Sequence, residues 1–478
     1  MRSEPAAPLR LIIVPETPNL STHNCSLFTI HCSLFTAMKD FAPAWVKDSI
    51  FYQIFPDRFC RSERYKAAGK FVDWNARPTR ENMFGGNLAG IEDRLKYIAD
   101  MGFNAIYLCP IFKSNSNHRY HTVDYFEIDP VLGTLKDFDR LVAKAHKLGL
   151  RVILDGVFNH CSRGFFQFNS LLELGRNSPY VDWFHIKKWP LKAYSKKANY
   201  ECWWNFPALP KFNTDNPEVR EYLMSVGEFW MKRGIDGWRL DVPNEINDDS
   251  FWQEFRRRIK AINPEAYIVG EIWDEPSRWL MGDQFDGVMN YMFRKAVLAY
   301  LFDENPISTE EFCRRLEEAF PKTRWYGSDE GETPAGDIPM NLLGSHDTIR
   351  LQSLPCSDGA RVRLALTLLF FMPGAPCIYY GEELGLKGGK DPDNRRTIPW
   401  DSLESLRKHP AYPYIKELIE LRKSNVALRK GDFSIKIGEN AFEIRRFYEE
   451  NGKKNVLELK VYGAQDGSSP SFAIFAPN

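Results

Sequence analysis

Short apolar segments alternate with amphipathic helical patterns along most of this chain. The amphipathic patterns, with apolar residues three to four positions apart, lie at Leu88–Met101, Leu135–Leu148, Pro217–Arg233, Ser250–Ile262 and Gly359–Phe371. Glycine follows three of these patterns directly, as expected of a helix stop. Eight apolar segments, which we predict to be strands, are Ser49–Pro56, Ala105–Pro110, Arg151–Val157, Gly237–Val242, Ala266–Ile272, Gly287–Tyr291, Met340–Ser345 and Ala375–Tyr380.

Eight strands that alternate with helices favour a parallel (β/α)8 TIM barrel, which we predict over residues 46–426. A doubly wound open sheet is the alternative, but no glycine-rich fingerprint follows the first strand. After Val157 the next helical pattern is delayed by a long segment dense in Trp, Tyr and Phe. Because long insertions in compact domains are usually functional, we expect an inserted subdomain over residues 161–213.

The two ends of the chain differ from this pattern. Short alternating strands with turns follow residue 427, at Phe433–Ile437, Phe442–Tyr448 and Val456–Val461, and predict a small C-terminal β-sandwich domain over residues 427–478. Near the N-terminus the pentapeptide CSLFT occurs twice, at residues 25–29 and 32–36. We predict a disordered or non-native tail over residues 1–45, with a small anchor as the alternative. Removal of residues 1–37 is expected to change neither stability nor activity.

Composition narrows the classes of partner. The chain has 478 residues with 63 basic and 63 acidic side chains, so we expect no nucleic-acid partner. No apolar run approaches the ~18 residues of a membrane span, so we expect no membrane partner. Nine cysteines without a CxxC pair indicate reduced thiols and a cytoplasmic protein.

Polar residues gather where several predicted strands end, which is where a β/α barrel carries its reactive groups. One aspartate at a strand end is usually a cap or an ion-pair partner. Several carboxylates, an arginine and two histidines on one rim would instead be costly unless they form an acid/base site. These residues are Asp155, Asn159, His160, Arg239, Asp241, Glu271, His346 and Asp347.

Carboxylates without a metal motif suit glycoside hydrolysis, in which one carboxylate attacks the anomeric carbon and a protonated one donates to the leaving oxygen. HExxH, DxDxDG and GxxxxGK[ST] are absent from the sequence, so we expect no required cofactor. The nearest metal-like cluster is Asn159 and His160 beside Asp155. Asn159 could ligate a structural calcium through its oxygen, or it could be a hydrogen-bonded brace.

Eight sequence blocks carry the most specific signal. The main blocks are DGVFNH (Asp155–His160), GWRLDVPNE (Gly237–Glu245), GEIW (Gly270–Trp273) and LLGSHDT (Leu342–Thr348). The secondary blocks are FGGNL (Phe84–Leu88), LPKFN (Leu209–Asn213), GAPCIYYG (Gly374–Gly381) and DPDNR (Asp391–Arg395). Together they resemble the α-amylase superfamily of retaining glycoside hydrolases, and within it the neopullulanase, cyclomaltodextrinase and maltogenic amylase group. The resemblance runs from about Val46 to beyond Trp400.

The resemblance implies a role for each matching carboxylate. Asp241 matches the catalytic nucleophile, and Glu271 matches the general acid/base, which needs a raised pKa. Asp347 matches the third carboxylate, which grips the 2- and 3-hydroxyls of the sugar. Arg239 lies two residues before Asp241 on the same strand face and should hold it ionised.

The resemblance also implies substrate-binding residues. His160 and His346 match the histidines that hydrogen-bond the sugar at subsite −1. His118 and Tyr120 match a sugar-edge donor and a stacking ring, with ordinary loop packing as the alternative. The remaining matches, nearer the neighbouring sugars, are Asn244, Glu245, Asp391 and Arg395.

Departures from the family pattern qualify the expected substrate. Pro243 stands where the relatives usually have alanine, which fixes the backbone just after the nucleophile. Glu245 could be a plain helix-start carboxylate instead of a substrate ligand. Only residues 1–45 precede the barrel, whereas the relatives carry an N-terminal domain that closes the site in a dimer, so we expect an open cleft and a monomer or weak homodimer.

We therefore expect retaining hydrolysis of α-1,4 bonds, and some α-1,6 bonds, in maltooligosaccharides, cyclodextrins, pullulan or starch. The alternatives are a transglycosylase or isomerase on the same barrel, or a non-catalytic glucan-binding protein. Binding proteins of this kind tend to lose catalytic carboxylates, whereas Asp241, Glu271 and Asp347 are all present.

Overall fold

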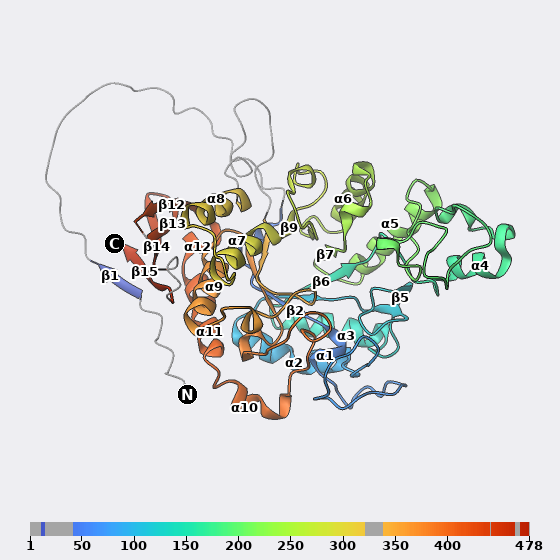
Figure 1. The fold of residues 1–478 in the computed structure, drawn as a ribbon, viewed down its shortest axis with the longest axis horizontal. Helices are drawn as coiled ribbons and strands as arrows, with labels where there is room; N and C mark the ends of the chain where they lie inside the picture. The colour runs from blue at the N-terminus through green and yellow to red at the C-terminus, as the bar shows by residue number, and fades with distance from the viewer. Residues whose placement is uncertain (1–10, 15–41, 321–337, 440, 464–468, 478) are drawn as a thin grey trace, which may run out of the picture.

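A closed barrel of eight parallel strands forms the centre of the molecule (Figure 1). The computed structural model describes residues 11–14, 42–320, 338–439, 441–463 and 469–477. Around the barrel the strands follow the order β10-β11-β2-β3-β6-β7-β8-β9, which confirms the predicted TIM barrel. Their bounds are β2 Phe51–Ile54, β3 Ala105–Leu108, β6 Arg151–Gly156, β7 Gly237–Leu240, β8 Tyr267–Gly270, β9 Gly287–Asn290, β10 Met340–Leu342 and β11 Ala375–Tyr379.

Helices surround the barrel, and local sequence sets their ends. Asn87 caps α2 by accepting a hydrogen bond from the Gly90 amide, and α2 stops at Gly102 with a left-handed φ of 102°. Thr134 and Asp137 form a capping box at the start of α3. The helices are α1 Pro56–Phe59, α2 Leu88–Met101, α3 Leu135–Lys147, α4 Phe166–Leu174, α5 Pro217–Lys232, α6 Asp249–Ile262, α7 Tyr291–Leu301, α8 Thr309–Ala319, α9 Gly359–Phe371, α10 Leu403–Leu406, α11 Ala411–Ser424 and α12 Val426–Lys430.

Two excursions leave the barrel on the side where its strands end. The first is a hairpin of β4 (Phe112–Ser114) and β5 (Thr122–Ile128), which the sequence patterns did not predict. The second is the segment between β6 and α5, which includes α4 and extends away from the barrel (Figure 1). A β-bridge between His160 and Lys211 closes the base of this second excursion. The aromatic-rich segment is thereby fixed beside the strand that carries Asp155.

The C-terminal strands form one sheet in the order β1-β15-β14-β13-β12, rather than the two packed sheets of the predicted sandwich. A single sheet suffices because its inner face packs on α8, where the rings of Phe442 and Phe312 lie 5.4 Å apart. The strands are β12 Asp432–Gly438, β13 Ala441–Glu450, β14 Lys453–Tyr462 and β15 Ser471–Pro477.

Strand β1 (Leu11–Val14) lies within the segment for which the sequence predicts a disordered tail, and it corrects that prediction for these four residues. It runs parallel to β15, with Leu11 opposite Ile474. The physical reason is that an apolar, β-branched tetrapeptide can add to an open sheet edge. The repeated pentapeptides lie outside the described residues.

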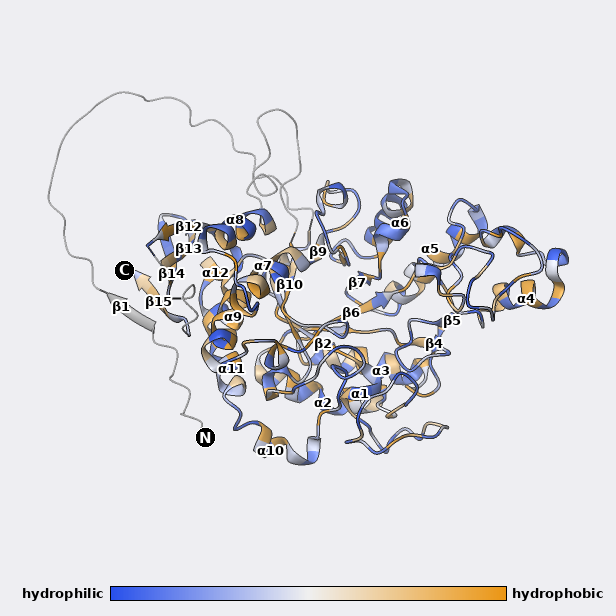
Figure 2. Ribbon diagram, in the orientation of Figure 1, coloured by the Kyte–Doolittle hydropathy of each residue, from blue (hydrophilic) through white to orange (hydrophobic). Residues whose placement is uncertain are grey.

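Apolar residues concentrate in the barrel strands and in the helices behind them (Figure 2). Helix α9 is buried along most of its length, and its sequence from Leu364 to Phe371 is apolar except for Thr367. None of the helices in the described ranges is long and apolar enough to cross a membrane. The core therefore fixes the strand ends, and these ends position the polar residues considered next.

Candidate active site

The barrel ladder itself places two of the predicted carboxylates. The Asp241 amide donates to Gly156 O at 3.0 Å, and the Glu271 amide donates to Leu240 O at 3.0 Å. Each residue therefore continues the parallel pairing by one position beyond its strand. Asp241 and Glu271 follow neighbouring strands, so their side chains reach the same rim.

One buried guanidinium joins three carboxylates. Arg239, which is fully buried, directs Nη1 toward both oxygens of Asp155, at 2.8 and 2.9 Å, and toward Asp241 Oδ1 at 3.0 Å. Its Nη2 lies 2.9 Å from Glu271 Oε2. This arrangement fixes Asp155, Asp241 and Glu271 around a single positive charge.

Burial shifts the titration of these groups. It raises the pKa of Asp241 well above its usual range; Arg239 opposes this shift, while Glu271, Asp155 and Asp347 add to it. Burial also raises the pKa of Glu271 and of Asp155, again against the attraction of Arg239. Three carboxylates around one cation cannot all ionise cheaply, so the group retains a proton and titrates as a unit.

Glu271 is held by two further donors that the sequence analysis missed. Its Oε2 accepts from the Val242 amide at 3.0 Å, and its Oε1 accepts from Trp273 Nε1 at 3.1 Å. Val242 has a left-handed φ of 35°, which is strained for a β-branched residue and aims its amide at Glu271. The Trp273 ring stacks on Tyr291 with centroids 3.7 Å apart.

The loops after β10 and β11 bring a second group of predicted residues together. Asp347 Oδ2 lies 3.1 Å from His346 Nε2, and Asp347 Oδ1 lies 3.2 Å from Arg395 Nη2. Arg395 also contacts Asp391 Oδ1 at 3.0 Å, and its Nε donates to the His346 carbonyl at 2.9 Å. The Asp347 side chain is 34% exposed, so it can still reach a ligand.

Tyr120 links these two groups. Its ring stacks on His346 with centroids 5.3 Å apart and an interplanar angle of 7°, and its hydroxyl donates to Asp155 Oδ2 at 2.9 Å. His118 lies beside it, where His118 Nδ1 accepts from the Tyr120 amide at 3.2 Å. Burial lowers the pKa of His118 well below its usual range, so this ring is neutral near pH 7.

His160 lies at the base of the aromatic excursion. Its Nδ1 faces Asn159 Nδ2 at 3.3 Å, and its ring stacks on Trp203 at 5.4 Å. Burial lowers the pKa of His160 to about 3, so it too is neutral. The Asn159 amide nitrogen braces His160, whereas Asn159 Oδ1 is buried without a hydrogen-bond partner in the described chain. Calcium ligation by that oxygen stays a prediction.

Asn244 and Glu245 occupy a 3-10 turn, Pro243–Glu245, directly after the strained Val242. Asn244 is exposed and Glu245 is partly buried. Lys211 Nζ donates to the Glu245 carbonyl at 2.6 Å, which ties this turn to the base of the excursion. The structure thus places both residues at the rim next to the end of β7, and no hydrogen bond or ion pair in the described chain joins their side chains to the three carboxylates.

Several polar residues of the site come from inside the barrel and were missed at the sequence level. Gln53 on β2 lies 2.9 Å from His346 Nδ1, and the Tyr107 hydroxyl on β3 donates to Asp155 Oδ2 at 2.5 Å. A polar residue within an otherwise apolar strand was the available signal. Trp273 lay within a recognised block, but its contact with Glu271 depends on side-chain placement that no motif specifies.

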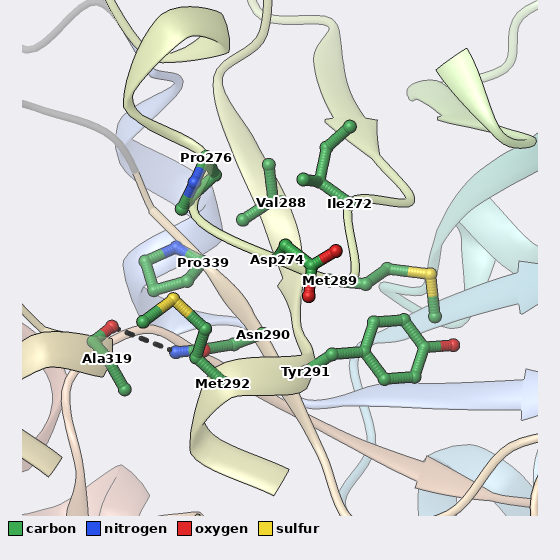
Figure 3. A pocket seen from close by; sticks show the side chains of 10 residues that line it. All are labelled: Ile272, Asp274, Pro276, Val288, Met289, Asn290, Tyr291, Met292, Ala319 and Pro339. Atoms are coloured by element: carbon green, nitrogen blue, oxygen red, sulfur yellow. Dashed lines mark hydrogen bonds between the residues drawn. The ribbon is translucent and has the colours of Figure 1, made fainter. Parts of the chain in front are cut away.

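A small hollow lies beside Tyr291, whose ring stacks on Trp273 (Figure 3). Asp274 and Tyr291 project along its wall, and Asn290 donates to the Ala319 carbonyl at 3.3 Å on the far side. It is lined by Ile272, Asp274, Pro276, Val288, Met289, Asn290, Tyr291, Met292, Ala319 and Pro339.

Comparison with known proteins gives consistent similarities. The family description "Alpha amylase, catalytic domain" matches residues 53–407. A cyclomaltodextrinase of Geobacillus thermopakistaniensis (strain MAS1) is 42% identical over 421 residues, which are 87% of this chain and 69% of that protein. Neopullulanase 2 of Thermoactinomyces vulgaris is 44% identical over 396 residues, or 82% of this chain and 65% of that protein.

A solved structure agrees with the sequence comparisons. The debranching enzyme from Nostoc punctiforme superposes with a TM-score of 0.78 at 43% identity, covering 89% of both chains.

Proposed function

The chain belongs to the α-amylase family of glycoside hydrolases, and we propose that it cleaves α-1,4-glucosidic bonds, and some α-1,6 bonds, with retention of anomeric configuration. The observation that carries this proposal is the contact of Arg239 with Asp155, Asp241 and Glu271 at three adjacent strand ends. Two carboxylates that touch one guanidinium are compatible with the ~5–5.5 Å separation of a retaining pair. The family requires no cofactor for this catalysis.

In the proposed reaction, an Asp241 oxygen attacks the anomeric carbon while Glu271 gives its proton to the leaving glycosidic oxygen. This step forms a glucosyl ester on Asp241 and frees the leaving sugar as an alcohol. Glu271 then takes a proton from water, whose oxygen attacks the anomeric carbon and releases Asp241. Two displacements at one carbon restore the original configuration.

The proton needed on Glu271 comes from the shared titration of the buried group. Burial raises the pKa of both Asp241 and Glu271, so the pair retains a proton at a pH where an exposed carboxyl has lost it. Arg239 contacts both carboxylates, Asp241 at 3.0 Å and Glu271 at 2.9 Å, so the guanidinium stabilises whichever of them is ionised, and the attacking role of Asp241 requires the ionised form there in the productive state. Trp273 and the Val242 amide keep Glu271 oriented through both steps.

The sugar at subsite −1 is proposed to lie against neutral histidines. Neutral His160 and His346 can hydrogen-bond hydroxyl groups without adding charge beside Arg239. Tyr120 offers a ring face, and Asp347 is exposed enough to accept from two neighbouring hydroxyls. His118 supports Tyr120 because its Nδ1 accepts a hydrogen bond from the Tyr120 backbone amide.

Neighbouring sugars are proposed to contact Arg395, Asp391, Asn244 and Glu245. The excursion adds Trp204, which is 71% exposed and stacks on Trp203 at 5.0 Å. Such a platform suits maltooligosaccharides, cyclodextrins, pullulan and starch. Transfer to a sugar acceptor in place of water is a second outcome at the same intermediate, because Asn244 and Glu245 lie beside the nucleophile.

Two properties of the whole protein belong to the proposal as well. We propose a monomer or weak homodimer, to be checked by sedimentation velocity. We also propose a cytoplasmic protein, supported by the free state of all seven cysteines in the described segments.

Product analysis tests the function directly. The protein is incubated separately with maltotriose, cyclodextrin, pullulan and starch, and the products are resolved by chromatography. NMR of the first-formed reducing sugar should show the α anomer, whereas early β product contradicts the retaining mechanism. Cleavage of amylose alone, without cyclodextrin or pullulan, contradicts the proposed substrate range. Inactivity on all four substrates contradicts the function.

A further inference from the structure

Gln53 is a polar residue inside an apolar barrel strand. It lies on β2, flanked by Tyr52 and Ile54, and is fully buried. Its Nε2 lies 2.9 Å from His346 Nδ1 and 3.4 Å from Cys109 Sγ. The side chain thus approaches the inner nitrogen of a histidine whose outer nitrogen faces the rim.

The surroundings of His346 decide which ring nitrogen carries its proton. His346 Nε2 lies 3.1 Å from Asp347 Oδ2, and a carboxylate can only accept a hydrogen bond. It also lies 2.6 Å from the Tyr120 hydroxyl, whose own hydrogen is directed to Asp155 Oδ2. Both neighbours of Nε2 are therefore acceptors, and Nε2 must supply the hydrogen.

A single ring proton then leaves the inner nitrogen bare. Burial lowers the pKa of His346 well below its usual range, and Arg395 and Arg239 add to this shift. A neutral ring with a proton on Nε2 has an unprotonated Nδ1, which needs a donor in a site without solvent. Among the described residues, two donors lie at hydrogen-bond distance from Nδ1, the Gln53 amide at 2.9 Å and the Cys109 thiol at 3.6 Å, and the amide is the nearer and the stronger donor.

We propose that Gln53 is a positioning residue that fixes the Nε2–H tautomer of His346 by donating its amide hydrogen to Nδ1. The donors then run in one direction, from Gln53 to His346, from His346 to Tyr120, and from Tyr120 to Asp155, which Arg239 also holds. This inference rests on the proposed function for its effect on catalysis, because it sets His346 to present a hydrogen to the −1 sugar or to Asp347.

Packing alone does not account for Gln53. Its Oε1 is buried without a hydrogen-bond partner among the described residues, and such an unsatisfied polar group destabilises the folded state. An apolar side chain of similar volume would avoid that cost. The amide is therefore explained by what its nitrogen does for His346.

The tautomer is measurable without any substrate. Protein labelled with ¹⁵N-histidine gives long-range ¹H–¹⁵N correlations that distinguish a protonated ring nitrogen from a bare one. The peaks of His346, one of nine histidines, are identified by their loss in H346Q. We expect a protonated Nε2 and a bare Nδ1 at pH 7. A protonated Nδ1 in the wild-type protein overturns the inference, whatever the activity assays give.

Two variants test the assignment to Gln53. Q53M keeps the volume but removes the donor, so the His346 peaks should shift toward mixed tautomers. Q53E keeps the shape but replaces the donor by an acceptor, so Nδ1 should become protonated. Both should lower kcat/KM on maltotriose by at least about tenfold, since a wrong tautomer presents the wrong group to its partner. Unchanged His346 peaks in a folded Q53M overturn the proposal; in Q53E the buried carboxyl still donates to Nδ1 while it is protonated, so its peaks are compared at low and at high pH.

Gln284 provides the matched control. It is also buried, and its Nε2 donates to Asp249 Oδ1 at 3.3 Å and to the Arg278 carbonyl at 3.2 Å, away from the histidines. Q284M should cost a similar amount of stability and leave both the His346 peaks and kcat/KM unchanged. An equal loss of kcat/KM in Q284M and Q53M would mean that lost packing, not the tautomer, explains the effect.

Discussion

Two buried acidic clusters lie at strand ends of the same barrel, yet they differ in access and in partners. The Arg239 cluster consists of Arg239, Asp155, Asp241 and Glu271. The Arg350 cluster consists of Arg350, which follows β10, and of Glu382 and Glu383, which follow β11, with the hydroxyls of Tyr52 and Tyr97. Burial raises the pKa of carboxyl groups in both.

The Arg350 cluster is closed by the protein itself. Glu383 Oε1 accepts from the Tyr52 hydroxyl at 2.7 Å and from the Tyr97 hydroxyl at 2.9 Å. Arg350 Nη1 lies 3.5 Å from Glu382 Oε1 and donates to the Tyr380 carbonyl at 2.8 Å. These contacts link β2, α2 and the segment after β11, which is a structural role.

The Arg239 cluster instead meets groups that can bind a ligand. It lies beside Asp347, whose side chain is 34% exposed, and beside the neutral rings of His160 and His346. A raised carboxyl pKa therefore does not by itself identify an active site, because structural clusters raise it too. The two clusters differ in the partly exposed Asp347 and in the neutral histidines, which lie only beside the Arg239 cluster.

The largest expected difference between the two clusters is the effect of substitutions on kcat. D241N and E271Q should each lower kcat on maltotriose by on the order of 10³-fold or more, because each removes an obligatory step. E382Q should keep kcat within about threefold, since Glu382 does not reach the reacting atoms. At pH 5, where Glu382 keeps its proton in the folded state, melting temperatures of all three variants should stay close to wild type. One-tenth of wild-type activity in D241N or E271Q would refute the assigned roles.

A smaller effect is expected on the pH dependence of the free energy of unfolding. Burial raises the pKa of Glu382 to about 7, so the folded state keeps this proton after the unfolded chain has lost it near pH ~4.3. Stability should therefore fall as pH rises from about 4.3 to about 7, by about 3 kcal/mol from this group. Urea unfolding at pH 5 and pH 8 should show that E382Q removes most of this loss.

The exposed Glu404 supplies the control, because its side chain is 87% exposed. E404Q should show the same pH dependence of unfolding as the wild type. Equal losses of unfolding free energy in E382Q and the wild type between pH 5 and pH 8 would mean that Glu382 ionises at little cost. The Arg350 cluster would then not be closed to solvent.

Sequence patterns predicted the barrel because each of its strands and helices is marked by a pattern of neighbouring residues. All eight strands were located, although several predicted ends ran past the observed ones, as at Ala105–Pro110 against Ala105–Leu108. The overrun reflects apolar residues that continue into the loops. The β4–β5 hairpin was missed because its pairing is short and irregular, and β1 because its partner β15 lies far along the chain.

The site was predictable to the extent that its residues fall within motifs. Asp241, Glu271, Asp347 and Arg395 lie in recognised blocks, and the structure brings them to one rim. The contacts of Gln53 arise only when separate strands meet inside the barrel. No spacing along the chain encodes that approach.

The smallest expected effect compares one hydroxyl in each cluster. The Tyr107 hydroxyl donates to Asp155 at 2.5 Å, and the Tyr97 hydroxyl donates to Glu383 at 2.9 Å. Y107F and Y97F each remove one donor to a buried carboxylate and should each cost about 1–2 kcal/mol of unfolding free energy. Only Y107F should also lower kcat/KM, by roughly tenfold, because Asp155 then competes more strongly for the Arg239 contact that Asp241 needs. The measurement is kcat/KM on maltotriose beside urea unfolding of both variants. An equal drop in kcat/KM for a fully folded Y97F would mean that the Arg350 cluster also sets the geometry of the reacting groups, and the distinction between the two clusters would fail.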